Sequence, residues 1–264
     1  MSEGFCPDHS PEYYEAFIRE LEYSIIFRED IYQKIGLKKA RRVLEVGFRQ
    51  GWITEEIRKH TEAQITAIDP DHINVADASE KIKGVEFFRD ATDKLSMRDE
   101  SFDIVFCHYF FIWKLKPFKA LMELRRVCKK GGFIVALAEP DYSGWLEHPD
   151  LELGKYFYKA IEKEGGDPDI GRKLLSIFSS AGLETELFVN SRVWTSDELE
   201  NCIASDWNVI LQEGLITEKE YEQKVEQELR TIKEKLRIIV FPVFTAIGKN
   251  VVLKEETIDP YDDL

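Results

Sequence analysis

A buried strand that turns at a glycine into a helix constrains this chain more than any other feature. The apolar run VLEV at residues 43–46 ends at Gly47, a second glycine follows at Gly51, and the segment WIT at 52–54 can begin a helix. Glycine at such a turn permits a positive φ and lets a ligand approach bare backbone. The helix beyond it offers unpaired N–H groups to a polar or anionic ligand. The stretch therefore predicts the ligand-binding turn of a parallel α/β sheet.

Apolar runs and helical segments alternate through the first half of the chain. We expect strands at 42–46, 65–68, 85–89, 101–107 and 133–138, with helices at 51–60, 72–82 and 116–129. Such alternation predicts a doubly wound, mostly parallel sheet with helices on both faces. Gly131 and Gly132 are expected to stop the helix 116–129 and to turn the chain into the fifth strand.

The second half predicts two more strands and a helical insertion. We expect a helix at 150–165, another from 170 to Gly182, a strand at 183–194 and a last strand at 241–247. Helical stretches at 196–213 and 217–237 lie between those strands, so the insertion 196–237 interrupts a hairpin. Its position predicts that it folds over the carboxyl ends of the strands.

The two ends of the chain carry weaker signals. Apolar residues at three- and four-residue spacing predict a helix over 11–36 that ends at Gly36, within an N-terminal cap of residues 1–36. The tail from Glu255 is expected to fray. Because no repeat or low-complexity linker divides the 264 residues, we expect a single domain over 1–264.

Composition excludes several classes of function. The formal net charge of −14 argues against a general nucleic-acid binder, because that affinity rests on Lys and Arg neutralising phosphates. No apolar run approaches a membrane span, and the acidic N-terminus does not resemble a signal peptide. The four cysteines are widely spaced without a CxxC pair, which is typical of free thiols rather than a metal site. We therefore expect a cytoplasmic protein without a metal centre.

Three stretches, in order, resemble class I S-adenosylmethionine-dependent methyltransferases. VLEVGFRQGWIT at 43–54 is similar to that family's first motif, VLE/DVGxGxGxxT, with Arg49 in place of the middle glycine. SFDIVFC at 101–107 is similar to the signature sFDlV, and ELRRVCKKGG at 123–132 to ExxRVLkpGG. The subgroup it resembles is type 11, related to ubiquinone and menaquinone biosynthesis. The resemblance covers roughly residues 40–195 and the last strand, and it implies a seven-stranded Rossmann-like sheet whose final strand runs antiparallel.

The resemblance implies S-adenosylmethionine as the cofactor. An acidic residue about 20 positions after the glycine turn can accept two hydrogen bonds from a ribose diol, which fits Asp69. Asp69 could instead cap the next helix, although Asp71 fits that role better. In the family, the acid at Asp90 faces the adenine amino group and the next backbone N–H meets a ring nitrogen. The implied cofactor-binding residues are Glu45, Gly47, Phe48, Arg49, Gly51, Asp69, Pro70, Asp90, Ala91 and His108.

The candidate catalytic residues are His108 and Glu139, which follow the fourth and fifth strands. A base is needed only if the acceptor is an alcohol, phenol or protonated amine, since the protein otherwise supplies proximity and alignment. A lone histidine there can also be a pocket wall. Asp103 begins its strand and is expected to be structural, because ligands bind at the carboxyl ends. Candidates for an apolar pocket that takes a small-molecule acceptor are Trp113, Tyr142 and Trp145.

Two other functions are alternatives to methyl transfer. A nicotinamide dehydrogenase would need glycines at 47, 49 and 52, but Arg49 and Trp52 occupy two of those positions. A non-catalytic binding or regulatory protein with a methyltransferase fold stays open because of Arg49. Its guanidinium can turn toward the cofactor's carboxylate, or it can fill the methionine subsite. The sequence favours the first outcome, because the ribose and adenine positions are intact.

Overall fold

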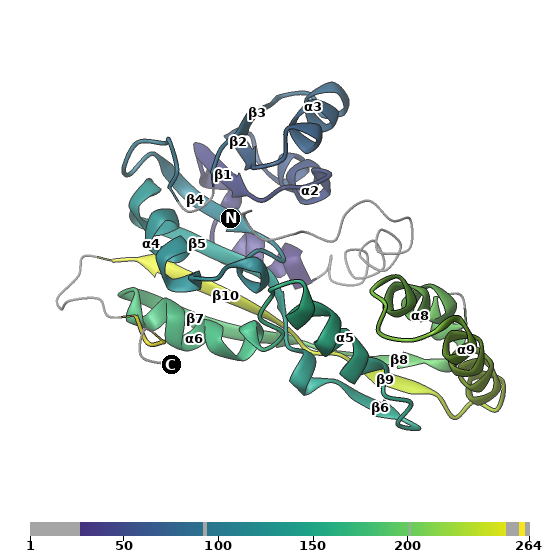
Figure 1. Cartoon of the computed structure of the whole chain (residues 1–264). Coiled ribbons are helices and arrows are strands. Elements are labelled where there is room, and N and C mark those ends of the chain that lie inside the picture. The colour runs from purple at the N-terminus through teal and green to yellow at the C-terminus, as the bar shows by residue number, and fades with distance from the viewer. Residues whose placement is uncertain (1–26, 92–93, 201, 252–258, 262–264) are drawn as a thin grey trace.

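A seven-stranded sheet forms the centre of the molecule (Figure 1). The computed structural model describes residues 27–91, 94–200, 202–251 and 259–261. The strand order is β3-β2-β1-β4-β5-β10-β7, with neighbours parallel except at β10, which runs antiparallel to β5 and β7. This confirms the expected doubly wound sheet with an antiparallel final strand. The strands are β1 Arg42–Val46, β2 Gln64–Asp69, β3 Val85–Arg89, β4 Phe102–Cys107, β5 Cys128–Pro140, β7 Leu183–Asn190 and β10 Val243–Asn250.

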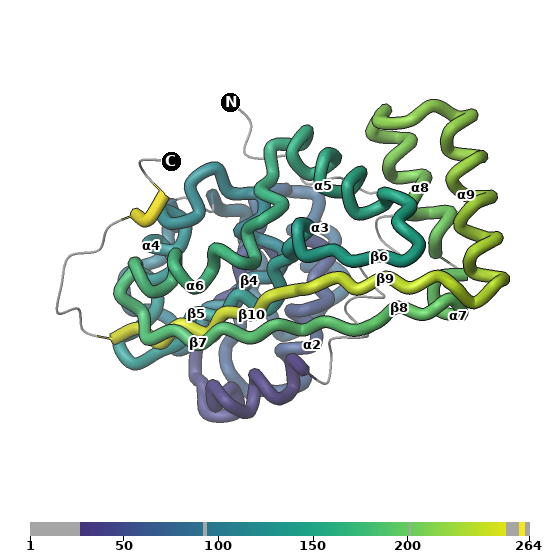
Figure 2. The backbone as a smooth tube through the Cα atoms, turned by 90° about the horizontal axis from the view of Figure 1, so that it is seen from below, coloured from purple at the N-terminus to yellow at the C-terminus, as the bar shows by residue number. Residues whose placement is uncertain are grey.

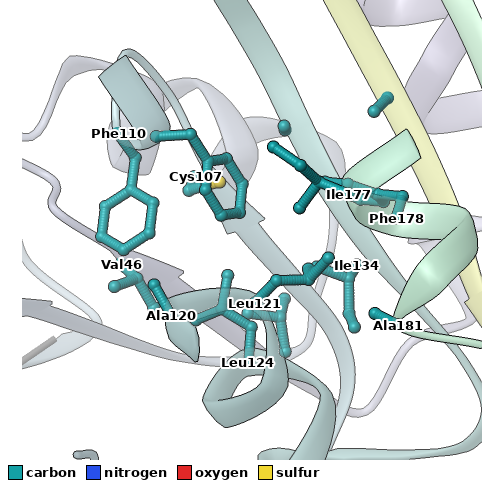
Figure 3. Packing of buried hydrophobic residues seen from close by; sticks show 14 of the residues in the cluster. Val46, Cys107, Phe110, Ala120, Leu121, Leu124, Ile134, Ile177, Phe178 and Ala181 are labelled. Atoms are coloured by element: carbon teal, nitrogen blue, oxygen red, sulfur yellow. The ribbon is translucent and has the colours of Figure 1, made fainter. Parts of the chain in front are cut away.

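Helices cover both faces of this sheet. On one face lie the described part of the first helix (27–34), α2 (Trp52–His60) and α3 (His72–Lys81), which bury apolar side chains against alternate positions of β1 and β2. On the other face lie α4 (Pro117–Val127) and α6 (Ile170–Ser180), which pack beside each other. Figure 3 shows Leu121 and Leu124 of α4 and Ile177 and Phe178 of α6 around Ile134 of β5. The buried middle strands therefore read as continuous apolar runs.

The glycine pair after α4 does not end this helix, contrary to the prediction. The helix already ends at Val127, and β5 begins at Cys128, so Gly131 and Gly132 lie inside the strand. Gly131 takes a φ of 78°, and a Cβ on Gly132 would lie 2.6 Å from the Asp103 carbonyl oxygen. The glycines thus allow the start of β5 to bulge against β4, where the pairing register shifts.

A second sheet, which the sequence did not reveal, carries the insertion. It has the order β6-β9-β8 and consists of β6 (Leu146–His148), β9 (Ile238–Val240) and β8 (Val193–Thr195). The predicted strand 183–194 is therefore two strands in two sheets, and the last expected helix ends at Lys233 rather than 237. Helices α5 (Leu153–Lys163), α7 (Ser196–Leu199), α8 (Ile203–Gln212) and α9 (Glu218–Lys233) pack on this sheet. We call residues 146–163 and 193–240 the accessory subdomain.

The accessory subdomain extends from the carboxyl edge of the main sheet. Val243, the first residue of β10, pairs with Pro140 at the end of β5 and with Asn190 at the end of β7. Chain segments β7–β8 and β9–β10 run from one sheet into the other as a long ribbon (Figure 2). In Figure 1, α8 and α9 stand beyond the end of this ribbon. The insertion therefore begins at the edge where ligands of parallel sheets bind.

One buried arginine ties the accessory subdomain together. The Arg237 side chain is fully buried and donates to Glu228 through Nε (2.6 Å) and Nη2 (2.8 Å). It also donates to Glu147 Oε2 (2.5 Å) and to the Pro149 carbonyl oxygen (2.7 Å). Trp207 Nε1 donates to the Glu228 carboxylate at 3.1 Å. A single cation thus links α9 with β6 and with the residue that follows β6.

The ends of the chain are only partly described. Residues 1–26 of the predicted cap lie outside the described residues, whereas Gly36 follows the first helix with a φ of 69°, as expected for a helix stop. In the tail, which was expected to fray, the described residues 259–261 place Tyr261 against α6, where its hydroxyl lies 2.7 Å from Ser176 Oγ. Within the described part of the chain, no helix has the length and apolarity needed to cross a membrane.

Candidate active site

The glycine turn between β1 and α2 has three residues in the left-handed region. Gly47, Arg49 and Gly51 take φ values of 76°, 54° and 81°. The turn is closed by a hydrogen bond from Gly47 N to the Ile68 carbonyl oxygen (2.8 Å) and by one from Gly51 N to the Phe48 carbonyl oxygen (2.8 Å). Arg49 departs from the family pattern at a position where glycine would be unstrained, and a side chain costs about 1–2 kcal/mol there.

Side chains lie close to the backbone of both Gly47 and Gly51. A Cβ on Gly51 would meet Ile82 Cδ1 at 2.6 Å, and one on Gly47 would meet Phe110 Cδ2 at 3.3 Å. Phe48, predicted as a cofactor contact, is buried beneath α3, where its ring lies edge-on to Phe87 with centroids 4.9 Å apart. The Phe48 side chain therefore anchors the turn to the core.

Asp69 ends β2 and joins the glycine turn to the next loop. Its Oδ2 accepts the Arg49 N–H (2.9 Å), while Oδ1 accepts the Asp71 N–H (2.9 Å) and the Asn74 amide (3.1 Å). The side chain is buried. A carboxylate offers about four acceptor positions, so one stays available. Asp71 caps α3 by accepting the Ile73 N–H at 2.8 Å, which confirms the capping assignment.

The Asp90 carboxylate closes the loop after β3. Its Oδ2 accepts the N–H (2.9 Å) and the hydroxyl (2.8 Å) of Ser96. Its Oδ1 accepts the Ala91 N–H at 2.9 Å, which is the donor that the resemblance assigns to an adenine nitrogen. Pro70 accepts a hydrogen bond from Arg89 Nε through its carbonyl oxygen (2.9 Å). These groups lie at the strand ends where the sequence predicted them.

Glu45 is buried within β1, below the first turn of α2. Its Oε2 accepts the Thr54 hydroxyl at 2.5 Å. Burial raises the pKa of Glu45 to about 8; the bond from Thr54 lowers it, and the Asp69 charge raises it further. A cation placed near Glu45 would favour its ionised form.

His108 follows β4 and is buried beside the glycine turn. Burial lowers its pKa well below the ordinary value, and the positive charges of Arg28 and Arg49 lower it further. The imidazole is therefore neutral near pH 7. Tyr109 follows it with a φ of 48° and a ring centroid 5.0 Å from that of His108. The sequence did not single out Arg28, whose guanidinium donates to Glu56 of α2 at 2.9 and 2.6 Å.

Glu139 lies fully buried near the end of β5. Its Oε1 accepts the N–H groups of Phe110 (2.7 Å) and Phe111 (2.8 Å), and its Oε2 accepts that of Ile112 (3.0 Å). Both oxygens of this candidate base therefore hold the main chain that follows His108. The sequence predicted its position at the strand end but gave no signal of these partners, because they depend on the path of a loop.

The aromatic residues expected to line an acceptor pocket lie near opposite ends of α5. Trp145 packs against Gly154, where a Cβ would meet its ring at 2.3 Å, and it stacks with Tyr142 at a centroid distance of 6.5 Å. Phe157 and Phe241 complete this aromatic cluster between the main sheet and the accessory subdomain. Trp113 instead packs against Gly166, beyond the other end of α5. Tyr142 thus stacks on Trp145, whereas Trp113 and Tyr142 both pack against the core formed with α4 and α6.

The strand order and the connecting helices define a Rossmann-like methyltransferase fold. Residues 44–136 match the family model described as a methyltransferase domain. A Schizosaccharomyces pombe protein named an uncharacterised methyltransferase is 30% identical over 153 residues, which cover 52% of this chain and 55% of that protein. Phosphatidylethanolamine N-methyltransferase of Cereibacter sphaeroides is 34% identical over 100 residues, or 36% of this chain and 48% of that protein. The chain thus matches about half the length of these curated relatives.

A solved structure agrees with the fold. A candidate methyltransferase of Bacillus halodurans superposes with a TM-score of 0.59 at 18% identity, covering 85% of this chain and 98% of that one. This likeness concerns the fold alone. Together with the family match, it confirms the resemblance that the motifs indicated: residues 44–136 form a class I S-adenosylmethionine-dependent methyltransferase domain of type 11.

Proposed function

We propose that this chain transfers a methyl group from S-adenosylmethionine to a small-molecule acceptor. The observation that carries the proposal is the bond between the Asp69 carboxylate and the Arg49 N–H, which joins the glycine turn to the end of β2. His108 reaches the same edge from β4. Three neighbouring strands thus lead to an acid, a bare glycine backbone and an imidazole at one edge of the sheet, and an acid beside a glycine turn suits a nucleoside ligand.

The residues at this edge suit the charges of the cofactor. Its amino-acid end carries an ammonium and a carboxylate. Arg49 supplies a charge opposite to the carboxylate, and Glu45 supplies a carboxyl group that the ammonium would help to ionise. Asp69 retains acceptor capacity for a ribose hydroxyl, and Asp90 lies at the next strand end for the adenine. We assign these four residues, with Gly47 and Gly51, to cofactor binding.

The chemistry requires little of the protein beyond alignment. When bound, the cofactor supplies an electrophilic methyl group on a sulfonium. The chain's own residues then orient the acceptor and exclude water. The neutral imidazole of His108 is able to accept a proton from an acceptor that must lose one. Glu139 is less suited to that task, because its oxygens already accept three main-chain hydrogen bonds.

The accessory subdomain is proposed to select the acceptor. It starts from the carboxyl edge of the sheet, and the aromatic cluster of Tyr142, Trp145, Phe157 and Phe241 lies at that junction. Aromatic side chains at such a junction favour an acceptor with apolar surface. Cys107, Cys128 and Cys202 are buried and form no disulfide with one another within the described residues, which supports our proposal of a reducing, cytoplasmic location.

A binding experiment followed by a transfer experiment tests the proposal. S-adenosylhomocysteine at about 100 times its Kd should stabilise the protein by about 2.7 kcal/mol, visible as a higher melting temperature. Labelled methyl transfer from S-adenosylmethionine would then be screened over amine, phenol, alcohol and carboxylate acceptors. No stabilisation by either compound would contradict the proposal. Binding without transfer to any acceptor would favour the non-catalytic alternative, for which the charge of Arg49 near His108 is the supporting observation.

A further inference from the structure

Glu139 joins the ends of two strands through a row of main-chain bonds. Residues 108–112, which we call the post-β4 turn, lead from β4 to the short helix η2 (Phe111–Trp113). Four consecutive N–H groups of this turn point at β5. That of Tyr109 donates to the Ala138 carbonyl oxygen at 2.8 Å, and those of residues 110–112 donate to the Glu139 carboxylate at 2.7–3.0 Å. The end of β5 therefore acts as a template for the turn.

The turn has a shape that needs such support. Tyr109 takes the left-handed conformation, with a φ of 48°, which costs about 1–2 kcal/mol for a residue with a Cβ. Non-glycine residues held in this region cluster at functional sites, where the surrounding structure imposes the geometry. Here the imposing groups are the Ala138 carbonyl and the Glu139 carboxylate.

The same turn touches the glycine turn assigned to the cofactor. The Phe110 ring packs so closely on Gly47 that a Cβ there would lie 3.3 Å from Phe110 Cδ2. Figure 3 shows this ring extending toward Val46 at the end of β1. The Phe110 N–H is itself one of the donors to Glu139. A shift of the carboxylate is therefore transmitted through one residue to Gly47.

We propose that Glu139 is a positioning residue of the methyl-donor site: it fixes the post-β4 turn so that Phe110 and His108 meet the glycine turn. This inference rests on the proposed function. A carboxylate is required because both oxygens must accept. A glutamine could accept from Phe110 and Phe111 through its oxygen, but its NH₂ would face the Ile112 N–H, and two donors repel.

The protonation of Glu139 gives a second way to release the turn. Burial raises its pKa to about 7, against the effect of the bonds from Phe111, Phe110 and Ile112 and of the Lys114 charge. The titratable groups facing it are Lys114 after η2 and the Cys107 thiol on β4, beyond which lies Glu45 on β1. From α6, the Arg172 guanidinium is bound to Asp141. A protonated Glu139 has one acceptor fewer for the turn.

The test compares Glu139→Gln with Asp141→Asn. Asp141 is a matched control, since it is equally buried two residues further on but accepts from Arg172 at 2.7 and 2.6 Å and from the Gly144 N–H at 3.0 Å. Amide hydrogen exchange of residues 110–112 and calorimetric titration with S-adenosylhomocysteine are measured on both variants and the wild type. Glu139→Asp keeps a carboxylate, and it takes the place of the glutamine variant in both measurements if that variant does not fold.

We expect the three amides to exchange about tenfold faster in Glu139→Gln, and S-adenosylhomocysteine to bind about tenfold more weakly, the effect of one lost charged hydrogen bond. Asp141→Asn should change the exchange rates of these amides and the affinity for S-adenosylhomocysteine by less than about twofold. Corrected for intrinsic exchange, wild-type protection should rise with pH around a midpoint near 7, and it should be flat in the glutamine variant. Glu139→Asp should recover part of the protection and part of the pH dependence.

Equal exchange in Glu139→Gln and Asp141→Asn would overturn the inference. So would wild-type affinity for S-adenosylhomocysteine in the glutamine variant, although cofactor binding itself would stand. If the wild type does not bind S-adenosylhomocysteine, the proposed function fails, and Glu139 loses its part in a methyl-donor site. The exchange data would then report only on the shape of the turn.

Discussion

Replacing Arg49 by glycine and by alanine separates backbone strain from side-chain charge. Both variants lack the guanidinium, but only alanine keeps a Cβ at a φ of 54°. A Cβ in the left-handed region costs about 1–2 kcal/mol. The larger freedom of glycine in the unfolded chain offsets about 0.4–1 kcal/mol of this. The glycine variant should therefore be more stable than the alanine variant by about 1 kcal/mol.

Urea unfolding at equal protein concentration, followed by circular dichroism, measures this difference directly. The corresponding gain in melting temperature is about 2–4 °C for a domain of this size. Gly36, also left-handed and with an open Cβ position, supplies a control: Gly36→Ala should destabilise by a similar amount. If the alanine variant at 49 is as stable as the glycine variant, Arg49 does not hold a left-handed conformation and the geometry of the turn described above is wrong.

Three further perturbations follow from the buried charges. Asp69→Ala should weaken S-adenosylhomocysteine binding, measured by calorimetry, by about 1.5–3 kcal/mol, which is the range for hydrogen bonds to a charged group. An unchanged affinity would refute the assignment of Asp69 to the ribose. Because burial raises the folded-state pKa of Glu45 from 4.5 to about 8, the contribution of Glu45 to stability should be greatest below pH 4.5 and should be lost as the pH rises toward 8. Urea unfolding across that range should show a smaller fall in Glu45→Gln, and an identical fall would refute the titration. Arg237→Met should destabilise by about 3–5 kcal/mol, since it leaves Glu228 buried without its cation, and a loss below about 1 kcal/mol would contradict that.

The main sheet was predictable because its strands are long enough to show a pattern. Strands such as β1 and β3 begin and end where the sequence placed them, since a short run rich in apolar residues between turn signals identifies a strand. The second sheet was missed because β6, β8 and β9 are three residues each. At that length no period can be read, and their pairing joins segments about 90 residues apart in the chain.

The site was predictable in position but not in connectivity. Gly47 and Asp69 lie at strand ends and Gly51 lies at the start of α2, so spacing along the chain determines their place. The bond from Arg49 N to Asp69, and the three bonds to Glu139, depend on loop paths that no local pattern encodes. The left-handed φ of Tyr109 was also hidden, because an aromatic residue gives no signal for it.

Calorimetric titration of S-adenosylhomocysteine into the wild type and Arg49→Gly tests the central claim most directly. The wild type should bind with one site per chain, and the glycine variant should bind more weakly, by about 10-fold or more, because it lacks a charge-assisted bond to the ligand's carboxylate. Absence of binding to the wild type would contradict the proposed methyltransferase. Tighter binding by the glycine variant would show that Arg49 obstructs the methionine subsite.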